Sequence, residues 1–180
     1  MILSDLQIRE ALETGDLAII PFDEGRGAIQ PASIDLRLGP TIFDLGANPV
    51  EGIYVDPNTL NVDSFIRSQS VTRDLSREPF FLQPGQFVIG ATLEHVTLST
   101  RLGARVDGKS RLARLGVGVH ITAPKIDPGF SNYITLEIFN LGPWTIMLQN
   151  EMEICSLILE LLGQPALRGY EGVFQGANPA

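Results

Sequence analysis

The sequence has few of the side chains that bind transition metals or cross-link a chain. It contains one cysteine and two histidines in 180 residues. Cys155 alone cannot form an intramolecular disulfide, and its apolar neighbours favour a buried packing role. A zinc site needs several His or Cys ligands at short spacings, so the sequence predicts no zinc site. His95 and His120 fall in different predicted strands, and we interpret His120 as a partly buried histidine that is satisfied by its neighbours.

Long hydrophobic segments and positive charge are also scarce. The chain has 13 Lys and Arg against 21 Asp and Glu, which gives a net charge of -8 at pH 7. Nucleic-acid binding depends largely on neutralising phosphates, so an acidic chain is a poor candidate for it. No apolar run reaches the ~18 residues of a membrane span, and the first residues do not resemble a signal peptide. We expect a cytoplasmic protein without nucleic-acid or membrane partners, in which a local cationic pocket can still bind a small anion.

The first segment of the chain carries a clear helix signal. Ser4 and Gln7 stand three residues apart, as a capping box requires, and Gly15 is well placed to end the helix. We therefore predict a helix over residues 5–14 whose role is packing.

The rest of the chain has the pattern of a mainly β protein. Residues 48–80 are polar and irregular, which predicts an excursion outside the core sheet. Short β-type segments separated by Gly and Pro predict a sandwich or small barrel. These predicted strands cover residues 33–38, 87–93, 117–122, 133–139, 145–148 and 154–159. We expect one domain over residues 1–180, and the glycines near its end predict a mobile tail at residues 168–180.

A basic segment between two glycines, residues 108–116, is the strongest candidate for binding an anion. It contains Lys109, Ser110, Arg111 and Arg114. Four of the thirteen Lys and Arg residues of this acidic chain, namely Arg105 and the three cations of this segment, fall within residues 105–114. Arginine can contact phosphate through two hydrogen bonds, whereas lysine acts as a point charge. A solvated basic turn is the alternative interpretation.

Two carboxylates follow at positions where they could move protons. Asp127 precedes Pro-Gly, where an aspartate is commonly only a turn residue. Glu137 lies in an alternating strand whose apolar face is formed by Ile134, Leu136 and Ile138. A carboxylate between apolar protein and water is suited to general acid–base catalysis. An exposed strand charge is the alternative interpretation of Glu137.

The order of these segments resembles the dCTP deaminase branch of the trimeric dUTPase-like superfamily. Residues 31–39 resemble its N-terminal signature strand, and residues 108–116 resemble its Gly-Arg-Ser-Ser-Leu-Ala-Arg-Leu-Gly motif. Residues 120–123 and 126–130 resemble the next motif, and residues 134–137 resemble the strand after it. The resemblance covers nearly the whole chain. It implies a distorted β-barrel or jelly-roll subunit with an N-terminal helix, which forms a homotrimer with sites at subunit interfaces.

The resemblance also implies an activity, the zinc-independent hydrolysis of dCTP to dUTP and ammonia. Ser110 and the carbonyl of Ala123 would position the attacking water. Glu137 would shuttle protons to N3 and to the leaving amine, and Arg114 would orient the water and balance charge. Mg²⁺ would enter with the triphosphate and bind no side chain directly. The implied substrate-binding residues are Lys109, Arg111, Asp127, Thr135, Leu136, Tyr170, Phe174 and Gln175.

The sequence departs from the family pattern around the phosphates. Lys109 replaces the usual arginine, and Arg111 replaces the usual serine. Residues 123–127 read Ala-Pro-Lys-Ile-Asp, which matches neither the monofunctional Ala-His-Arg-Ile-Asp nor the bifunctional Ala-Gly-x-Ile-Asp. Residues 173–177 lack both polar ligands of the usual Lys-Tyr-x-x-Gln pattern. We expect Arg111 or Lys125 to compensate electrostatically.

Three functions stay open on the sequence. The joint presence of Ser110, Arg114 and Glu137 favours a dCTP deaminase. The Gly-rich residues 168–176 are similar to dUTPase tails and favour a dUTP diphosphatase or a bifunctional enzyme, although Ser156 stands where dUTPases usually carry glutamine. The altered C-terminal ligands favour a non-catalytic, nucleotide-binding regulatory protein. In each case the expected ligand is a deoxynucleoside triphosphate, which is dCTP first and dUTP or dTTP otherwise.

Overall fold

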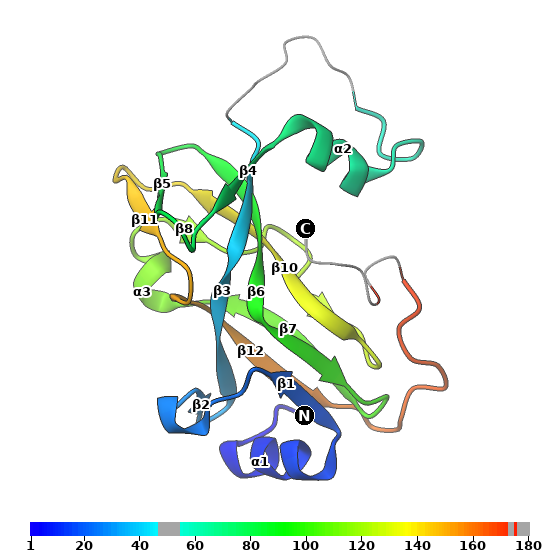
Figure 1. The fold of residues 1–180 in the computed structure, drawn as a ribbon. Coiled ribbons are helices and arrows are strands. Elements are labelled where there is room, and N and C mark those ends of the chain that lie inside the picture. The colour runs from blue at the N-terminus through cyan, green and yellow to red at the C-terminus, as the bar shows by residue number, and fades with distance from the viewer. Residues whose placement is uncertain (47–54, 173–174, 176–180) are drawn as a thin grey trace.

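A curled antiparallel sheet forms the centre of the molecule (Figure 1), as seen in a computed structural model that describes residues 1–46, 55–172 and 175. Its main path runs in the order β8-β10-β6-β3-β12-β7-β9, with β1 beside β6 and both β2 and β4 beside β3. The strands of this sheet are β1 (Leu17–Ile20), β2 (Ile29–Gln30), β3 (Ser33–Asp44), β4 (Val71–Asp74), β6 (Phe87–Leu98), β7 (Leu102–Gly108), β8 (Val117–Gly118), β9 (Lys125–Ile126), β10 (Ser131–Asn140) and β12 (Glu153–Leu161). A second sheet pairs β5 (Phe80–Leu82) with β11 (Ile146–Leu148).

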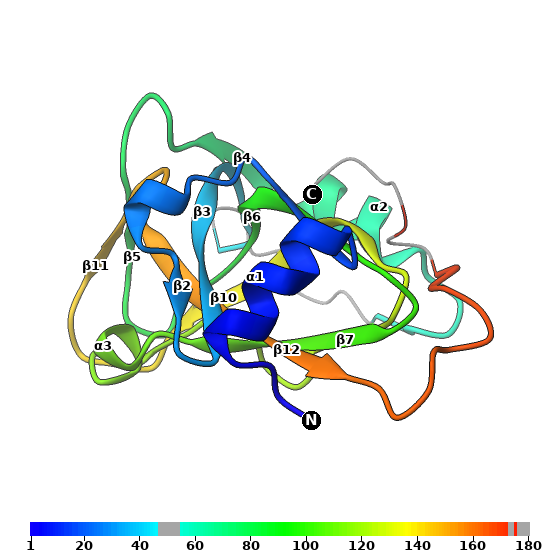
Figure 2. The same ribbon diagram turned by 90° about the horizontal axis from the view of Figure 1, so that it is seen from below.

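The predicted N-terminal helix is confirmed as α1 (Asp5–Thr14). Ser4 and Gln7 form the expected capping box, and Gly15 ends the helix in the left-handed conformation at φ 78°. Figure 2 shows α1 lying across one end of the molecule, where it packs against β1 and β2. Ile8 and Ala11 are its buried residues, so the helix covers the core as expected.

The longest strands, β3, β6, β10 and β12, were predicted in part and extend beyond the predicted bounds. The prediction over residues 117–122 was too long, because only residues 117–118 are a strand. β7 was missed, although its alternating Leu102, Ala104 and Val106 are buried in the expected pattern.

The predicted excursion at residues 48–80 is correct only in part. Residues 48–54 lie outside the described residues. Helix α2 (Val62–Gln69) has no buried residue and projects from the sheet in Figure 1. β4, however, pairs with β3 and so belongs to the main sheet. The remaining helical segments are the 3-10 helix η1 (Glu24–Arg26) and α3 (Ser110–Ala113). None of the helices in the described residues has the length and apolar character needed to span a bilayer.

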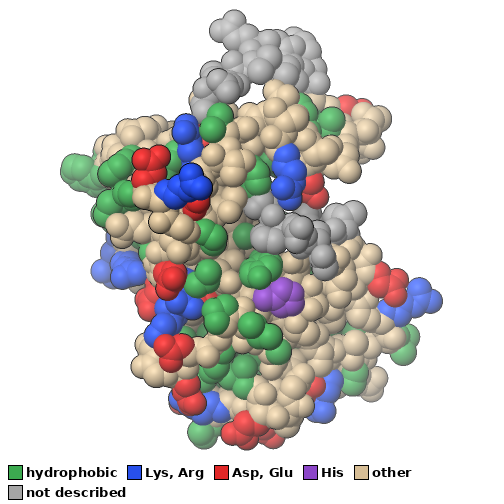
Figure 3. Space-filling model, in the orientation of Figure 1, with side chains coloured by type: hydrophobic (Ala, Val, Ile, Leu, Met, Phe, Trp, Pro, Cys, Tyr) green, Lys and Arg blue, Asp and Glu red, His purple; other side chains and the backbone are tan. Residues whose placement is uncertain are grey.

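On the face shown in Figure 3, Lys, Arg, Asp and Glu side chains are visible at the surface, and several hydrophobic side chains lie near the middle beside a histidine. A few charged groups are nevertheless buried, namely Asp35, Asp44 and Glu94. Burying a charge is unfavourable unless it is paired and hydrogen-bonded. The partners of these carboxylates therefore indicate which contacts the fold requires.

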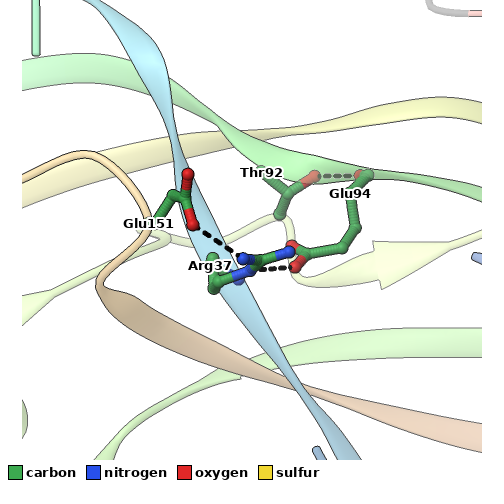
Figure 4. A network of polar contacts seen from close by, with 4 residues as sticks. All are labelled: Arg37, Thr92, Glu94 and Glu151. Carbon is green, nitrogen blue, oxygen red and sulfur yellow. Dashed lines mark hydrogen bonds and ion pairs between the residues drawn. The ribbon is translucent and has the colours of Figure 1, made fainter. Parts of the chain in front are cut away.

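Arg37 joins three parts of the sheet (Figure 4). Its Nε donates to Oε1 of Glu94 at 2.7 Å, and its backbone N–H donates to Oε2 of the same carboxylate at 2.8 Å. Its Nη1 donates to Oε2 of Glu151 at 2.9 Å, in the turn before β12. The Thr92 hydroxyl donates to the carbonyl of Glu94 at 2.7 Å. The side chains of Arg37 and Glu94 are 11% and 4% exposed, so their pair links β3 to β6 away from bulk water. The contact with Glu151, which is 58% exposed, extends the network to the surface at the β12 turn.

We expect Arg37→Met to lower the free energy of unfolding by about 3–5 kcal/mol, because it leaves Glu94 buried and unpaired. Chemical denaturation followed by circular dichroism would measure the change. Arg77→Met is the matched control, since Arg77 is 85% exposed and forms a surface pair with Asp74. It should change stability by less than about 1 kcal/mol. Equal effects of the two variants would contradict the assigned role of the Arg37 network.

Candidate active site

A cavity of about 270 Å³ lies beside the outward face of β10. Five of the residues that the sequence assigned to the site line it together. They are Ala123, Asp127, Thr135, Glu137 and Tyr170. Thr135 and Glu137 come from β10, whereas Ala123 and Asp127 flank β9, which pairs with β7. The curl of the sheet brings these two parts of it to one cavity.

Glu137 occupies a fixed position on the wall of this cavity. Ile134, Leu136 and Ile138 are buried, as predicted, so the opposite pleat of β10 directs Glu137 outward. The backbone N–H of Ile121 donates to Glu137 Oε2 at 2.8 Å, and the backbone N–H of Glu137 donates to the Val119 carbonyl at 3.0 Å. One carboxylate oxygen is therefore held by backbone, which orients the group beside the segment that carries Ala123.

A second carboxylate, Asp127, and several aromatic rings share the cavity. Asp127 Oδ1 pairs with the Lys125 ammonium at 2.7 Å, and the Asp127 side chain is 40% exposed. The rings of Phe130 and Tyr170 pack with their centroids 6.0 Å apart. The cavity thus combines two acids with flat apolar walls, an arrangement suited to a ring-containing polar ligand.

The C-terminal segment lies against the cavity rim. The backbone N–H of Tyr170 donates to the Pro128 carbonyl at 2.8 Å. Gln175 Nε2 donates to the Gly129 carbonyl at 3.2 Å, and its Oε1 accepts from the Ser131 N–H at 3.1 Å. Gln175 therefore contacts the backbone of residues 129 and 131, at the start of β10. Phe174 lies outside the described residues. Mobility of the tail stays a prediction.

The basic segment lines a different cavity, of about 380 Å³, to which Lys109 and Ser110 contribute. Four of its nine residues form the single helical turn α3, and hydrogen-bonded turns follow at residues 114–116. Lys109 pairs with Asp35, and Arg111 Nη2 donates to the Glu153 carbonyl at 3.2 Å. Seven of the predicted site residues thus line one or the other of two separate cavities.

Arg114 and Leu136 differ from the other predicted residues in their placement. Arg114 is the exposed C-cap of α3. The side chain of Leu136 is fully buried in the core, so only its backbone could contact a ligand.

Two residues from the sequence interpretation have a clear outcome. Cys155 is buried as predicted, and burial, with further contributions from the nearby carboxylates of Glu94 and Asp35, raises the pKa of its thiol well above the usual range. The thiol is therefore no nucleophile. The interpretation of His120 was wrong in one respect. His120 is partly buried, but its Nδ1 has no hydrogen-bond partner among the described residues, and its side chain lines the cavity with Glu137.

Metal ligands are sparse around both cavities. In the described part of the chain, no group of three or more His, Cys, Asp or Glu side chains is arranged to hold a metal ion.

Comparison with known proteins identifies the family of this chain. The model of the dCTP deaminase-like family matches residues 2–162. The chain belongs to this family. A relative from Dictyoglomus thermophilum named dCTP deaminase, dUMP-forming, is 44% identical over 94% of this chain and 85% of its own. One from Natronomonas pharaonis named dCTP deaminase is 41% identical, with the same coverage.

Structural comparison agrees with this family. The crystal structure of 2′-deoxycytidine 5′-triphosphate deaminase from Agrobacterium tumefaciens matches with a TM-score of 0.68 and 25% identity. The match covers 89% of this chain but only 48% of the solved chain, so this protein spans about half of that one. The mainly β fold expected from the family resemblance is confirmed.

Sequence reasoning did not assign to the site several residues that line this cavity. Phe130 and Tyr133 line the cavity, as does His120. The alternation of β10 could have revealed Tyr133, because it shares the outward pleat with Glu137. Phe130 belongs to the motif at residues 126–130, but its ring reaches the cavity only because the preceding residues form a turn.

We expect Gly129→Ala to displace the C-terminal segment. Gly129 has φ 81°, and an added Cβ would lie 2.4 Å from Cα of Gly169. Limited trypsin digestion at Arg168 should become faster than in the unmodified protein. Gly169→Ala is the matched control, since its Cβ would meet only ordinary contacts beginning at 3.4 Å. Unchanged digestion of Gly129→Ala would argue against close docking of the segment.

Proposed function

We propose that this protein hydrolyses dCTP at C4 of the cytosine ring and releases ammonia. The observation that carries the proposal is the cavity in which Glu137 is held by backbone beside Ala123 and Asp127. Membership in the dCTP deaminase-like family supports the same reaction. A cytoplasmic location is part of the proposal, because deoxynucleoside triphosphates are made and used there.

Glu137 is suited to both proton transfers of this reaction. In the first step water adds to C4, and Glu137 takes a proton from the water and delivers it to N3. In the second step Glu137 moves the remaining hydroxyl proton to the amino group. The C4–N bond then breaks, ammonia leaves and the C4 carbonyl forms. We assign the Ala123 carbonyl as acceptor for the attacking water, which fixes its orientation before attack.

Ser110 and Arg114 require a second subunit in this scheme. Ser110 lines a cavity separate from that of Glu137, and Arg114 is exposed at the end of α3. We propose that a homotrimer brings α3 of one copy to the Glu137 cavity of its neighbour. Ser110 would then complete the water site, and Arg114 would balance the charge on Glu137.

Magnesium fits this site as part of the substrate. Without a ligand cluster in the described residues, the phosphate oxygens would supply most of its coordination. When bound, the ion would neutralise charge on the phosphate chain. Asp127 is sufficiently exposed to meet a water of that complex or the deoxyribose.

A second candidate function is removal of diphosphate from the deaminated nucleotide to give dUMP. Asp127 supplies a second carboxylate in the same cavity. The Dictyoglomus relative is named for dUMP formation, whereas the Natronomonas relative is named for deamination alone. dUTP as final product is the alternative, and a purely regulatory nucleotide-binding role is the third.

The purified protein should be incubated with Mg²⁺ and either dCTP or dUTP, and ammonia and pyrophosphate should be followed separately. We expect ammonia from dCTP. Ammonia without pyrophosphate would identify dUTP as the product, whereas both would identify dUMP. Pyrophosphate from dUTP without ammonia from dCTP would mean a diphosphatase. Binding of dCTP with neither product would favour the regulatory role and contradict the proposal.

We expect Glu137→Gln to lower kcat for ammonia release by about 10²–10⁴-fold, because the amide cannot transfer the proton. Binding of dCTP should change little, and calorimetry would measure it. Glu10→Gln is the matched control, since Glu10 is exposed on α1. A Glu137→Gln enzyme with normal kcat would remove this residue from the reaction.

A further inference from the structure

Asp35 is a buried carboxylate for which the proposed reaction gives no role. It lies near the start of β3 and is 4% exposed. Its register partner on the adjacent strand β12 is Ser156. Since an unpaired carboxylate is strongly disfavoured at such burial, its partners must satisfy it.

Both oxygens of Asp35 have partners on neighbouring strands. The Ser156 hydroxyl donates to Oδ1 at 2.8 Å. The Lys109 ammonium pairs with Oδ2 from the residue that follows β7. Since β3, β12 and β7 are consecutive in the sheet, this contact joins three strands at one point.

The pairing holds Lys109 at the wall of the second cavity. Its side chain is 18% exposed and lines that cavity with Ser110. An ammonium has three N–H donors, and Asp35 occupies one. Glu153 lies 3.9 Å from Nζ, which is too long for a hydrogen bond. Lys109 therefore retains hydrogen-bonding capacity while its long side chain is held in one place.

We propose that Asp35 is a positioning residue for the phosphate chain of the nucleotide, acting through Lys109. This inference rests on the proposed function. A lysine that is already fixed loses less side-chain freedom when an anion binds, which favours binding. Ser156 fixes the Asp35 carboxylate in turn. In the opposite role, Asp35 competes with phosphate for the Lys109 ammonium. In that case, removing the charge of Asp35 would strengthen phosphate binding.

The first test is Asp35→Asn, measured as kcat and KM for ammonia release from dCTP. We expect KM to rise by roughly 5–10-fold and kcat to stay within about twofold. This pattern arises when the substrate and the transition state lose the same binding energy. The amide still accepts from Ser156 but lacks the charge that holds Lys109. A lower KM would establish competition, and an unchanged KM would also overturn the proposal.

A double variant tests whether Asp35 acts through Lys109. Lys109→Met should raise KM, and Asp35→Asn should add little further loss in its presence, because the positioned group is already gone. Lys109→Arg should retain most of the affinity, since the guanidinium keeps the charge. Fully additive losses from Asp35→Asn and Lys109→Met would show that Asp35 acts by another route.

Asp44→Asn is the matched control for loosening of the fold. Asp44 lies at the other end of β3, is also 4% exposed, and pairs with Arg73 at 3.4 Å and Gln86 at 3.0 Å. It should lower the melting temperature comparably while leaving KM unchanged. A similar KM increase in Asp44→Asn would assign the effect to general destabilisation and overturn the proposal.

Binding of inorganic tripolyphosphate separates this inference from the proposed function. Calorimetry should show weaker binding to Asp35→Asn than to the unmodified protein. If the unmodified protein released no ammonia but this difference remained, the positioning role would survive the failure of the reaction. If it deaminated dCTP and the difference were absent, only the positioning role would fail.

Discussion

The pleat of β10 places the core and the candidate site on opposite sides of one strand. Leu136 and Ile138 enter the core, whereas Thr135 and Glu137 line the cavity. Pairing with β6 fixes this register, and a slip of one residue would exchange the two faces. Because burial of the apolar face is strongly favourable, the fold itself directs the side chain of Glu137, the catalytic candidate, toward the cavity. The backbone N–H of Ile121 then sets the orientation of its carboxylate.

β3 provides the complementary support through buried charge. Arg37 forms ion pairs with Glu94 and with a glutamate in the turn before β12. Asp35 accepts a hydrogen bond from Ser156 and pairs with Lys109. Arg37 meets Glu94 on β6, and Asp35 meets Lys109 just after β7, so these segments must lie close to β3. The first network stabilises the sheet, and the second reaches the wall of a cavity. Buried polar groups on one strand thus connect stability with the proposed binding of phosphate.

Local patterns predicted the elements whose signals are contained within a few residues. The capping box defined α1, alternation identified β3 and β10, and β-rich composition identified β6 and β12. The order of motifs identified the family, which the comparisons confirmed. α2 was missed because its signal lies in a polar region and its packing is slight. The strand predicted at residues 117–122 is shorter because the chain leaves the sheet after Gly118 and instead presents backbone to Glu137.

By itself, the sequence determined the mainly β class, the N-terminal helix and the outward direction of Glu137, because each follows from short-range periodicity or capping. Only the tertiary structure decided that Lys109 pairs with Asp35 and that Ser110 and Glu137 line separate cavities. Those relations depend on the order of strands in the sheet. Strand order arises from burial and pairing across the whole chain, so no local pattern specifies which distant charges will meet.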